Sequence, residues 1–239
     1  MSIGMERMAL GFGALLILAA LALFFLENDE PRLIRELKVE STGEISREEV
    51  LLRSQLKEGD AVRPGDIERA RRKLEKLARV KEARFRWEES GALRVSIRER
   101  RCAALVRPLP GGRIFEVDES LRVLARDVPS CSDLPLFSGP FQRRDDTFGD
   151  SRLRSLLGLW AELKRSYPIL EKRISEVRLK RGGGMILYLA GARLRVEASE
   201  PFRFRDAHRL YASLAYLESQ GAFSGGKLDL RGTDAVFAP

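Results

Sequence analysis

The chain has 239 residues, enough for one large domain or two small ones, and its 44% apolar residues are sufficient for a packed core. Lys and Arg number 43 against 35 Asp and Glu, a net charge of +8, but the two signs interleave along the chain. Nucleic-acid binding, which gathers basic residues on one surface, is therefore disfavoured. A single histidine and two cysteines are too few ligands for a structural zinc finger, which excludes that class.

The N-terminal segment predicts a membrane anchor. Nineteen uncharged residues run from Met8 to Leu26, and as a helix they would extend about 28 Å, close to the hydrocarbon thickness of a bilayer. A cleaved signal peptide is the alternative, but its apolar region would normally stop after about 7–15 residues. An arginine precedes the segment and acidic residues follow it, so residues 1–7 are expected in the cytoplasm and everything from Glu27 onward outside.

Residues 27–101 predict a small α+β domain with the element order β-α-α-β-β. Ser46 and Glu49 form a capping box at the start of the first helix, and apolar residues spaced three and four apart mark the second. Apolar and charged residues alternate in the last two strands, which predicts a hairpin. The elements are expected at residues 34–39, 46–56, 67–77, 83–87 and 93–97. The two helices should cover one apolar face of a three-stranded sheet.

Residues 102–239 predict a second α+β domain, a β domain built around a long antiparallel sheet with two helices. Strands are expected at residues 104–106, 114–117, 121–123, 174–180, 185–190, 193–196, 227–231 and 235–237. One helix carries an apolar face from Leu153 to Leu163 and should end near Pro168. The other follows Pro201. The intervening residues 129–150 are polar and contain proline, which favours a loop.

The two cysteines, Cys102 and Cys131, would lie outside the membrane, in an oxidising compartment. A disulfide between them would close a loop of about 30 residues and stabilise the fold by roughly 3–4 kcal/mol. Two buried thiols are the alternative. Sequence spacing does not establish the geometry that a disulfide requires, so both interpretations stay open.

The search for catalytic residues favours a protein that is not an enzyme. The chain has no nucleophile elbow and no phosphate-binding glycine loop. His208 would have to supply any imidazole base, yet it sits on a helical pattern typical of a surface histidine. Carboxylate pairs such as Glu116 with Asp118 and Asp145 with Asp146 stand at predicted turns, where Asp is common for backbone hydrogen bonding. We expect no cofactor, no metal and no small-molecule substrate.

Several short motifs, in order, resemble the FtsQ/DivIB bacterial cell-division family over essentially the whole chain. They are Ile34-x-x-Leu37-x-Val39-x-x-x-Gly43, Leu77-x-x-Val80-x-x-Ala83, Val95-x-Ile97-x-Glu99 before Ala103-Ala104, Val117-Asp118-x-x-Leu121-Arg-Val123, Leu134-Pro-Leu-Phe-Ser-Gly139 and Leu228-Asp-Leu-Arg231. Members of this family have a single membrane span, a POTRA domain and a following β domain. This chain departs from the pattern at Cys102, where proline is usual, and at Gly232, where some members carry an aromatic residue.

The resemblance implies a scaffold of the division machinery, located in the inner membrane at the division septum with its bulk in the periplasm. FtsQ-like proteins recruit the small coiled-coil membrane proteins FtsB and FtsL and help control septal peptidoglycan synthesis. A terminal strand with unpaired backbone groups suits such recruitment by β-strand addition. The implied contact residues are Leu228, Asp229, Leu230, Arg231, Ala235, Val236 and Phe237 of the last strands, with Arg209, Tyr211 and Tyr216 of the preceding helix. Of the strand residues, Asp229, Arg231 and Phe237 are expected to be exposed.

Two other functions remain as alternatives. An envelope assembly or secretion factor could use the same POTRA domain, although the repeated ten-residue strands of an outer-membrane barrel are missing from the sequence. A membrane-tethered cell-wall hydrolase is the other, since two carboxylates about 5–10 Å apart suffice for glycoside hydrolysis.

Overall fold

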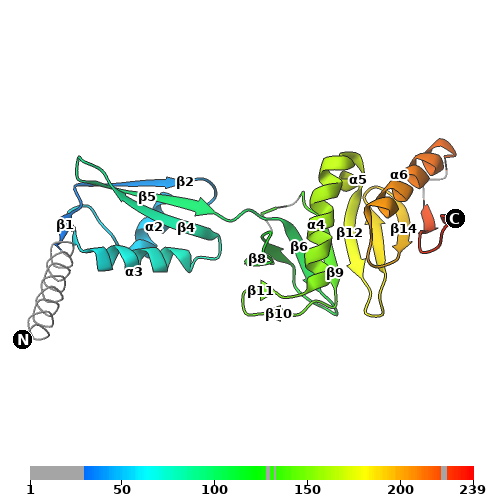
Figure 1. Ribbon diagram of the computed structural model, residues 1–239, viewed down its shortest axis with the longest axis horizontal. Coiled ribbons are helices and arrows are strands. Elements are labelled where there is room, and N and C mark those ends of the chain that lie inside the picture. The colour runs from blue at the N-terminus through cyan, green and yellow to red at the C-terminus, as the bar shows by residue number, and fades with distance from the viewer. Residues whose placement is uncertain (1–29, 128–129, 132, 222–224) are drawn as a thin grey trace, which may run out of the picture. The chain divides into compact units, whose positions relative to one another are not determined.

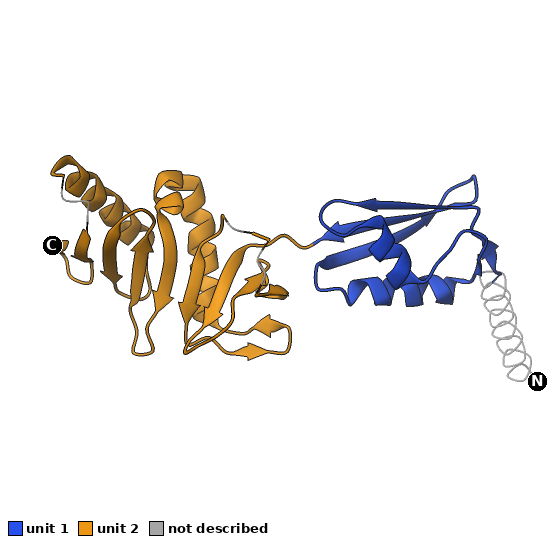
Figure 2. Ribbon diagram, turned by 180° about the vertical axis from the view of Figure 1, so that it is seen from behind, with its two compact units in different colours: residues 1–99 blue, residues 100–239 orange. Residues whose placement is uncertain are grey.

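The computed structural model describes residues 30–127, 130–131, 133–221 and 225–239. It divides the chain into two compact units, residues 1–99 and 100–239 (Figure 2); the boundary was expected after Arg101. The predicted cytoplasmic tail and the predicted transmembrane helix over residues 8–26 lie outside the described residues. Within the described ranges, no helix has the length and apolar character that crossing a bilayer requires.

Unit 1 has the expected β-α-α-β-β order. Its main elements are β2 (Glu36–Ser41), α2 (Arg47–Ser54), α3 (Pro64–Glu75), β4 (Val80–Trp87) and β5 (Ala92–Glu99). They form a sheet of order β2-β5-β4, in which β2 is parallel and β4 antiparallel to β5. Two short strands that the sequence analysis did not predict, β1 (Arg32–Leu33) and β3 (Ala61–Val62), pair with each other.

Local sequence signals explain the helices of unit 1. The Ser46 hydroxyl accepts a hydrogen bond from the Glu49 amide at 3.2 Å, so the predicted cap of α2 is confirmed. Pro64 occupies the first turn of α3, where its missing N–H leaves no donor unsatisfied. Apolar residues of both helices share one core with the strands, including Leu74 and Leu93, which are fully buried. Burial of this face holds the layer of helices on the sheet (Figure 1).

Unit 2 contains a nine-stranded sheet of order β16-β15-β14-β13-β12-β9-β6-β7-β8. Its strands are β6 (Ala104–Pro108), β7 (Phe115–Val117), β8 (Val123–Arg126), β9 (Leu136–Gly139), β12 (Ile174–Leu179), β13 (Met185–Leu189), β14 (Arg193–Ala198), β15 (Gly225–Asp229) and β16 (Val236–Ala238). Its helices are α4 (Ser151–Ser166), α5 (Pro168–Arg173) and α6 (Phe204–Ser219). A two-strand ribbon, β10 (Arg143–Arg144) with β11 (Thr147–Phe148), completes the unit.

The helices lie against one face of this sheet (Figure 1). Trp160 of α4 and Leu210 of α6 share a core with Val196 of β14 and Leu228 of β15. Because neighbouring residues of a strand point to opposite faces, the side chains beside these, such as Glu197, lie on the other face. That second face carries most of the charged residues of the strands.

Three predictions for unit 2 are wrong. Residues 129–150 are not only a loop, since they contain β9, which lies in the middle of the sheet between β6 and β12. The sheet is mixed rather than antiparallel, because β9 is parallel to both of its neighbours and β15 is parallel to β14. A third helix, α5, begins directly at Pro168. Helices connect β14 to β15 and precede β12, and a helical crossover returns the chain to the same end of a sheet.

Candidate functional site: the C-terminal edge of the sheet

The strand β16 forms one end of the nine-stranded sheet. It pairs antiparallel with β15, with Asp229 opposite Val236 and Leu228 opposite Phe237. Among the described residues, no strand pairs with the other side of β16. Its outward backbone N–H and C=O groups are therefore available to an added strand.

The predicted contact segment 228–231 is not itself a free edge, which corrects the expectation from sequence. β15 is paired on one side with β14 and on the other with β16. The Leu230 amide donates to the Glu197 carbonyl at 2.8 Å, which continues the pairing beyond the strand. Because both sides of this segment are used within the fold, only β16 can accept another strand at this end of the sheet.

The side chains of the last strands divide between the two faces. Leu228 and Leu230 are buried in the core, and Phe237, which lies opposite Leu228, is half-buried against the same core. Val236 is 61% exposed and lies opposite Asp229, on the face away from the helices. Phe237 and Asp229 therefore lie on opposite faces, and the expectation that both are exposed is wrong, since each is half-buried.

Gly226 allows the close approach of β15 and β16. Its φ is +111°, a conformation that side-chain-bearing residues rarely adopt. A Cβ atom at this position would lie 2.5 Å from the Ala238 carbonyl oxygen and 3.0 Å from the Phe237 ring. At Gly225 a Cβ would lie 3.7 Å from the Arg193 Cβ and 4.0 Å from its carbonyl oxygen, both ordinary contacts. This glycine pair directly precedes the predicted strand, and the alternation of apolar residues that marks the strand does not reveal it.

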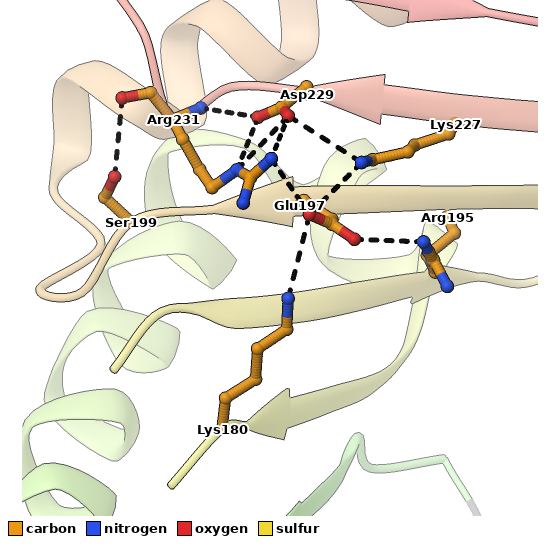
Figure 3. Close-up of polar contacts among 7 residues, drawn as sticks. All are labelled: Lys180, Arg195, Glu197, Ser199, Lys227, Asp229 and Arg231. Carbon is orange, nitrogen blue, oxygen red and sulfur yellow. Dashed lines mark hydrogen bonds and ion pairs between the residues drawn. The ribbon is translucent and has the colours of Figure 1, made fainter. Parts of the chain in front are cut away.

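A network of charges covers the open face beside the edge (Figure 3). Glu197 is at its centre and is 6% exposed. Its carboxylate lies 3.0 Å from Arg195, 3.3 Å from Lys227, 3.3 Å from Arg231 and 3.7 Å from Lys180. The Arg231 guanidinium also donates to Asp229, with its Nε 2.9 Å from Oδ1. Four cations and two anions give the network a net positive charge.

The pKa values of both carboxyl groups are lowered in this network. Burial raises the pKa of Glu197, but Lys227, Lys180 and Arg231 outweigh it and hold that pKa below its ordinary value. Hydrogen bonding from Arg231 holds the pKa of Asp229 far below its ordinary value. Asp229 and Arg231, two of the three residues expected to be exposed, are thus paired with each other. The carboxylates of Glu197 and Asp229 are both charged at neutral pH.

The helix α6 contacts the C-terminal edge through Arg209. Arg209 donates to the Leu230 carbonyl at 3.2 Å and to the Gly232 carbonyl at 2.9 Å, which holds the turn between β15 and β16. Tyr216 is two helical turns further along, on the same side as Arg209, and is 65% exposed. This side of the helix therefore lies at the edge where Arg209 contacts the turn.

Tyr211 lies on a different side of α6, close to the opposite one from Arg209. Its ring is 5.6 Å from that of Tyr167, which also contacts Phe204. The Tyr167 hydroxyl is 3.0 Å from Nδ1 of His208, so this histidine is part of the same aromatic group. The structure thus brings Arg209 to the C-terminal edge, with Tyr216 on the same side of α6, and places Tyr211 on a different side.

A second group of chemically reactive side chains lies at the other end of the sheet. The sulfur atoms of Cys102 and Cys131 and a carboxylate oxygen of Glu116 all lie within 4.8 Å of one another. Both cysteines are thiols in the structure. The sequence analysis paired the two cysteines but did not place Glu116 beside them.

No protein-family model matches the chain, and no curated protein matches its sequence. The solved structures that resemble it include POTRA1-2 and POTRA1-3 of the periplasmic domain of Omp85 from Anabaena, each at 13% identity with a TM-score of 0.29. The matches cover 35% and 87% of this chain, and 56% and 95% of those structures. The chain thus spans little more than half of the first. Both consist of POTRA domains, and similarity at this TM-score carries no argument about function.

Proposed function

We propose that the protein is a non-enzymatic scaffold that binds an extended segment of a partner protein by adding it as a strand to β16. The observation that carries this proposal is the position of β16 at the end of the sheet, paired on one side only among the described residues. Main-chain hydrogen bonds would supply affinity, and side chains on either face of the added strand would supply selectivity.

The two faces beside β16 differ in chemistry and so define the partner segment. On the helix side, an added strand would meet the flank of α6 that carries Arg209 and the exposed Tyr216. On the open side it would lie beside the positively charged network around Glu197 and Arg231. A segment that alternates apolar residues with acidic ones fits both faces.

The finer proposal is that this scaffold belongs to the bacterial divisome and recruits FtsB/FtsL-like membrane proteins. Its support is the resemblance of the sequence motifs to the FtsQ/DivIB family, together with the order of an apolar N-terminal segment, a β-α-α-β-β unit and a strand-rich unit. In this proposal residues 8–26 anchor the protein in the inner membrane, and both units lie in the periplasm.

A POTRA-containing envelope assembly factor is the second candidate. A groove of about 1120 Å³ runs along β4, an edge strand of the sheet of unit 1, and is lined in part by Phe85 and Trp87. A partner of an assembly factor would bind there rather than at β16.

The decisive test compares Gly226→Ala with Gly225→Ala in the full-length chain. An added Cβ at Gly226 collides with β16, whereas one at Gly225 does not, so only the first change should displace the edge strand. We expect Gly226→Ala to weaken capture of the FtsB-like protein of the same organism by about tenfold or more, from the 1–3 kcal/mol typical of such strain. Capture would be measured by titration of the detergent-solubilised proteins.

The possible results separate the two levels of the proposal. Equal binding by both variants would refute β16 as the docking strand. If the FtsB-like protein does not bind the unchanged chain, while Gly226→Ala abolishes capture of another membrane protein, the scaffold stands and the divisome assignment fails. If Phe85→Ala in unit 1 abolishes capture and Gly226→Ala does not, the assembly-factor candidate replaces the proposal.

A further inference from the structure

β8 and β9 follow each other along the chain but are not neighbours in the sheet. β8 is the last strand at its end of the sheet, and β9 lies on the far side of both β7 and β6. β7 is antiparallel to β8 and to β6, and β6 is parallel to β9, so β8 and β9 run in the same direction. The chain must therefore cross two strands before it enters the centre of the sheet. Ser130 and Cys131 belong to this crossing connection.

Glu116 of β7 fixes the connection where it crosses. Its neighbours Phe115 and Val117 point into the core, so the carboxylate lies on the opposite face, yet it is only 1% exposed. Its Oε1 atom accepts hydrogen bonds from the Cys131 amide at 3.1 Å, from the Ser130 hydroxyl at 3.0 Å and from the Ser130 amide. Three donors on one oxygen hold this part of the connection against β7.

Cys102 precedes β6 and comes close to Cys131. Its Sγ lies 3.8 Å from the Ala104 carbonyl oxygen, and the two sulfur atoms and the Glu116 carboxylate lie within 4.8 Å of one another. A disulfide needs about 2.05 Å between sulfurs, so the two side chains must approach each other further to form one. We propose that Cys102 and Cys131 form a disulfide that fastens the β8–β9 connection across β7 to the start of β6.

Thiol–disulfide exchange with a small or protein disulfide supplies the oxidation. One cysteine, as its thiolate, attacks the oxidant disulfide, forms a mixed disulfide and releases one thiolate. The second cysteine then attacks the mixed disulfide and releases the other. The two thiol protons pass to the two leaving thiolates, so the oxidant is reduced to two thiols as the new S–S bond forms. Glu116 keeps its Ser130 and Cys131 donors throughout.

The same side chains also suggest a metal site, which the hydrogen bonding disfavours. Two thiolates and a carboxylate would give three ligands with one open position. However, Oε1 of Glu116 is already occupied by three donors from the connection itself. Through Oε1 the carboxylate is therefore engaged in holding the chain, which favours a bond between the two sulfurs over a shared metal ion.

The test uses the full-length protein treated with oxidised glutathione, denatured without reductant and alkylated with iodoacetamide. We expect neither cysteine to be alkylated, a mass lower by two hydrogens, and a proteolytic fragment that links Cys102 to Cys131. Oxidation should raise the melting temperature of unit 2 by on the order of 10 °C. The Cys102→Ala/Cys131→Ala variant, treated in the same way, should show no such shift.

Three results would overturn the proposal. They are two alkylated cysteines after the oxidant has reached equilibrium, links between chains instead of within one, and a within-chain link that leaves the melting temperature unchanged. Zinc chloride added to the reduced protein provides a further check, since protection of both thiols by the metal alone, with no disulfide after oxidation, would make the group a metal site. None of these measurements involves β16 or a partner, so they are independent of the proposed function.

Discussion

The two ends of the nine-stranded sheet are built differently. At the β8 end, the segment that contains β11 closes over the chain, because the Val123 amide donates to the Asp146 carbonyl at 2.7 Å and the Phe148 amide donates to the Leu121 carbonyl at 3.0 Å. At the β16 end, no comparable segment covers the strand within the described part of the chain. The start of β8 is thus covered by a backbone segment, whereas β16 has no such cover among the described residues.

Electrostatics separates the same two ends. At the β16 end, Glu197 is nearly buried and contacts four cations. At the β8 end, Asp127 makes a single 3.2 Å contact with Arg113, and both side chains are well exposed. The two ends therefore differ in how their carboxylates are held: Glu197 lies among four cations on the open face, whereas Glu116, next to the β8 end, accepts its hydrogen bonds from Ser130 and Cys131.

The largest effect on partner capture is expected when proline replaces a residue of β16, the strand at the open end of the sheet. If the N–H of Val236 faces outward, Val236→Pro removes a donor to an added strand; if it faces β15, the change detaches β16. In either case partner capture should weaken roughly thirtyfold, from the lost hydrogen bond, about 1 kcal/mol, and a similar cost from the proline ring against the neighbouring strand. The matched change Ala125→Pro in β8 should leave capture intact. Titration of both variants with the same partner measures the difference, and equal losses would remove the distinction between the ends.

A smaller effect, on stability, is expected from the carboxylates. Glu197→Gln leaves four cations facing a single anion and should lower the free energy of unfolding of unit 2 by about 1–2 kcal/mol, reduced by the partial exposure of its partners. Asp127→Asn should cost about 0.5 kcal/mol or less. Urea unfolding followed by Trp160 fluorescence, in a Trp87→Phe background that silences the other tryptophan, reports unit 2 by itself.

Measuring the same unfolding free energies at acid pH provides the control for the Glu197→Gln prediction. The pKa of Glu197 is lowered from its ordinary 4.5, so the stability that it contributes is complete above that pH and is lost as the pH falls through the folded-state pKa. The gap between wild type and Glu197→Gln should therefore narrow below about pH 4.5. A gap that is constant with pH would mean that the charge of Glu197 is not what stabilises this end.

The smallest effect on partner capture is expected from tyrosines on different sides of α6. Tyr216→Ala removes an exposed aromatic ring from the side of the helix that carries Arg209, and capture should fall roughly threefold to tenfold. Tyr211→Ala, on the side that packs with Tyr167, should leave capture within about twofold of wild type. A larger loss from Tyr211 would move the docking surface away from the edge.

Local patterns in the sequence predicted unit 1 well. The cap at Ser46 and the alternation through Phe85 and Val95 act over a few residues, and the structure has the helix and the hairpin that they predict. β9 escaped prediction because Phe137 and Ser138 are both fully buried, so a strand in the centre of the sheet shows no alternation of apolar and polar residues.

The candidate site was predicted in part, for a related reason. Residue types placed the last strands and α6 in the right region, but they did not reveal which strand ends the sheet. That depends on the parallel pairing of β15 with β14, which brings together residues about 30 positions apart, such as Val196 and Leu228. The separation of Tyr211 from Tyr216 follows from helical geometry alone and could have been predicted from their spacing.

The contact of β16 with Gly226 has a consequence for motion. β16 consists of three residues, and among them only Phe237 packs its side chain against the core. Gly226 of β15 has no side chain to pack against β16. Few side-chain contacts would therefore break if β16 separated from β15 while the rest of the sheet stayed folded. A bound segment would close that local opening, so amide protons at this end of the fold would exchange with solvent more slowly in the complex than in the unbound protein.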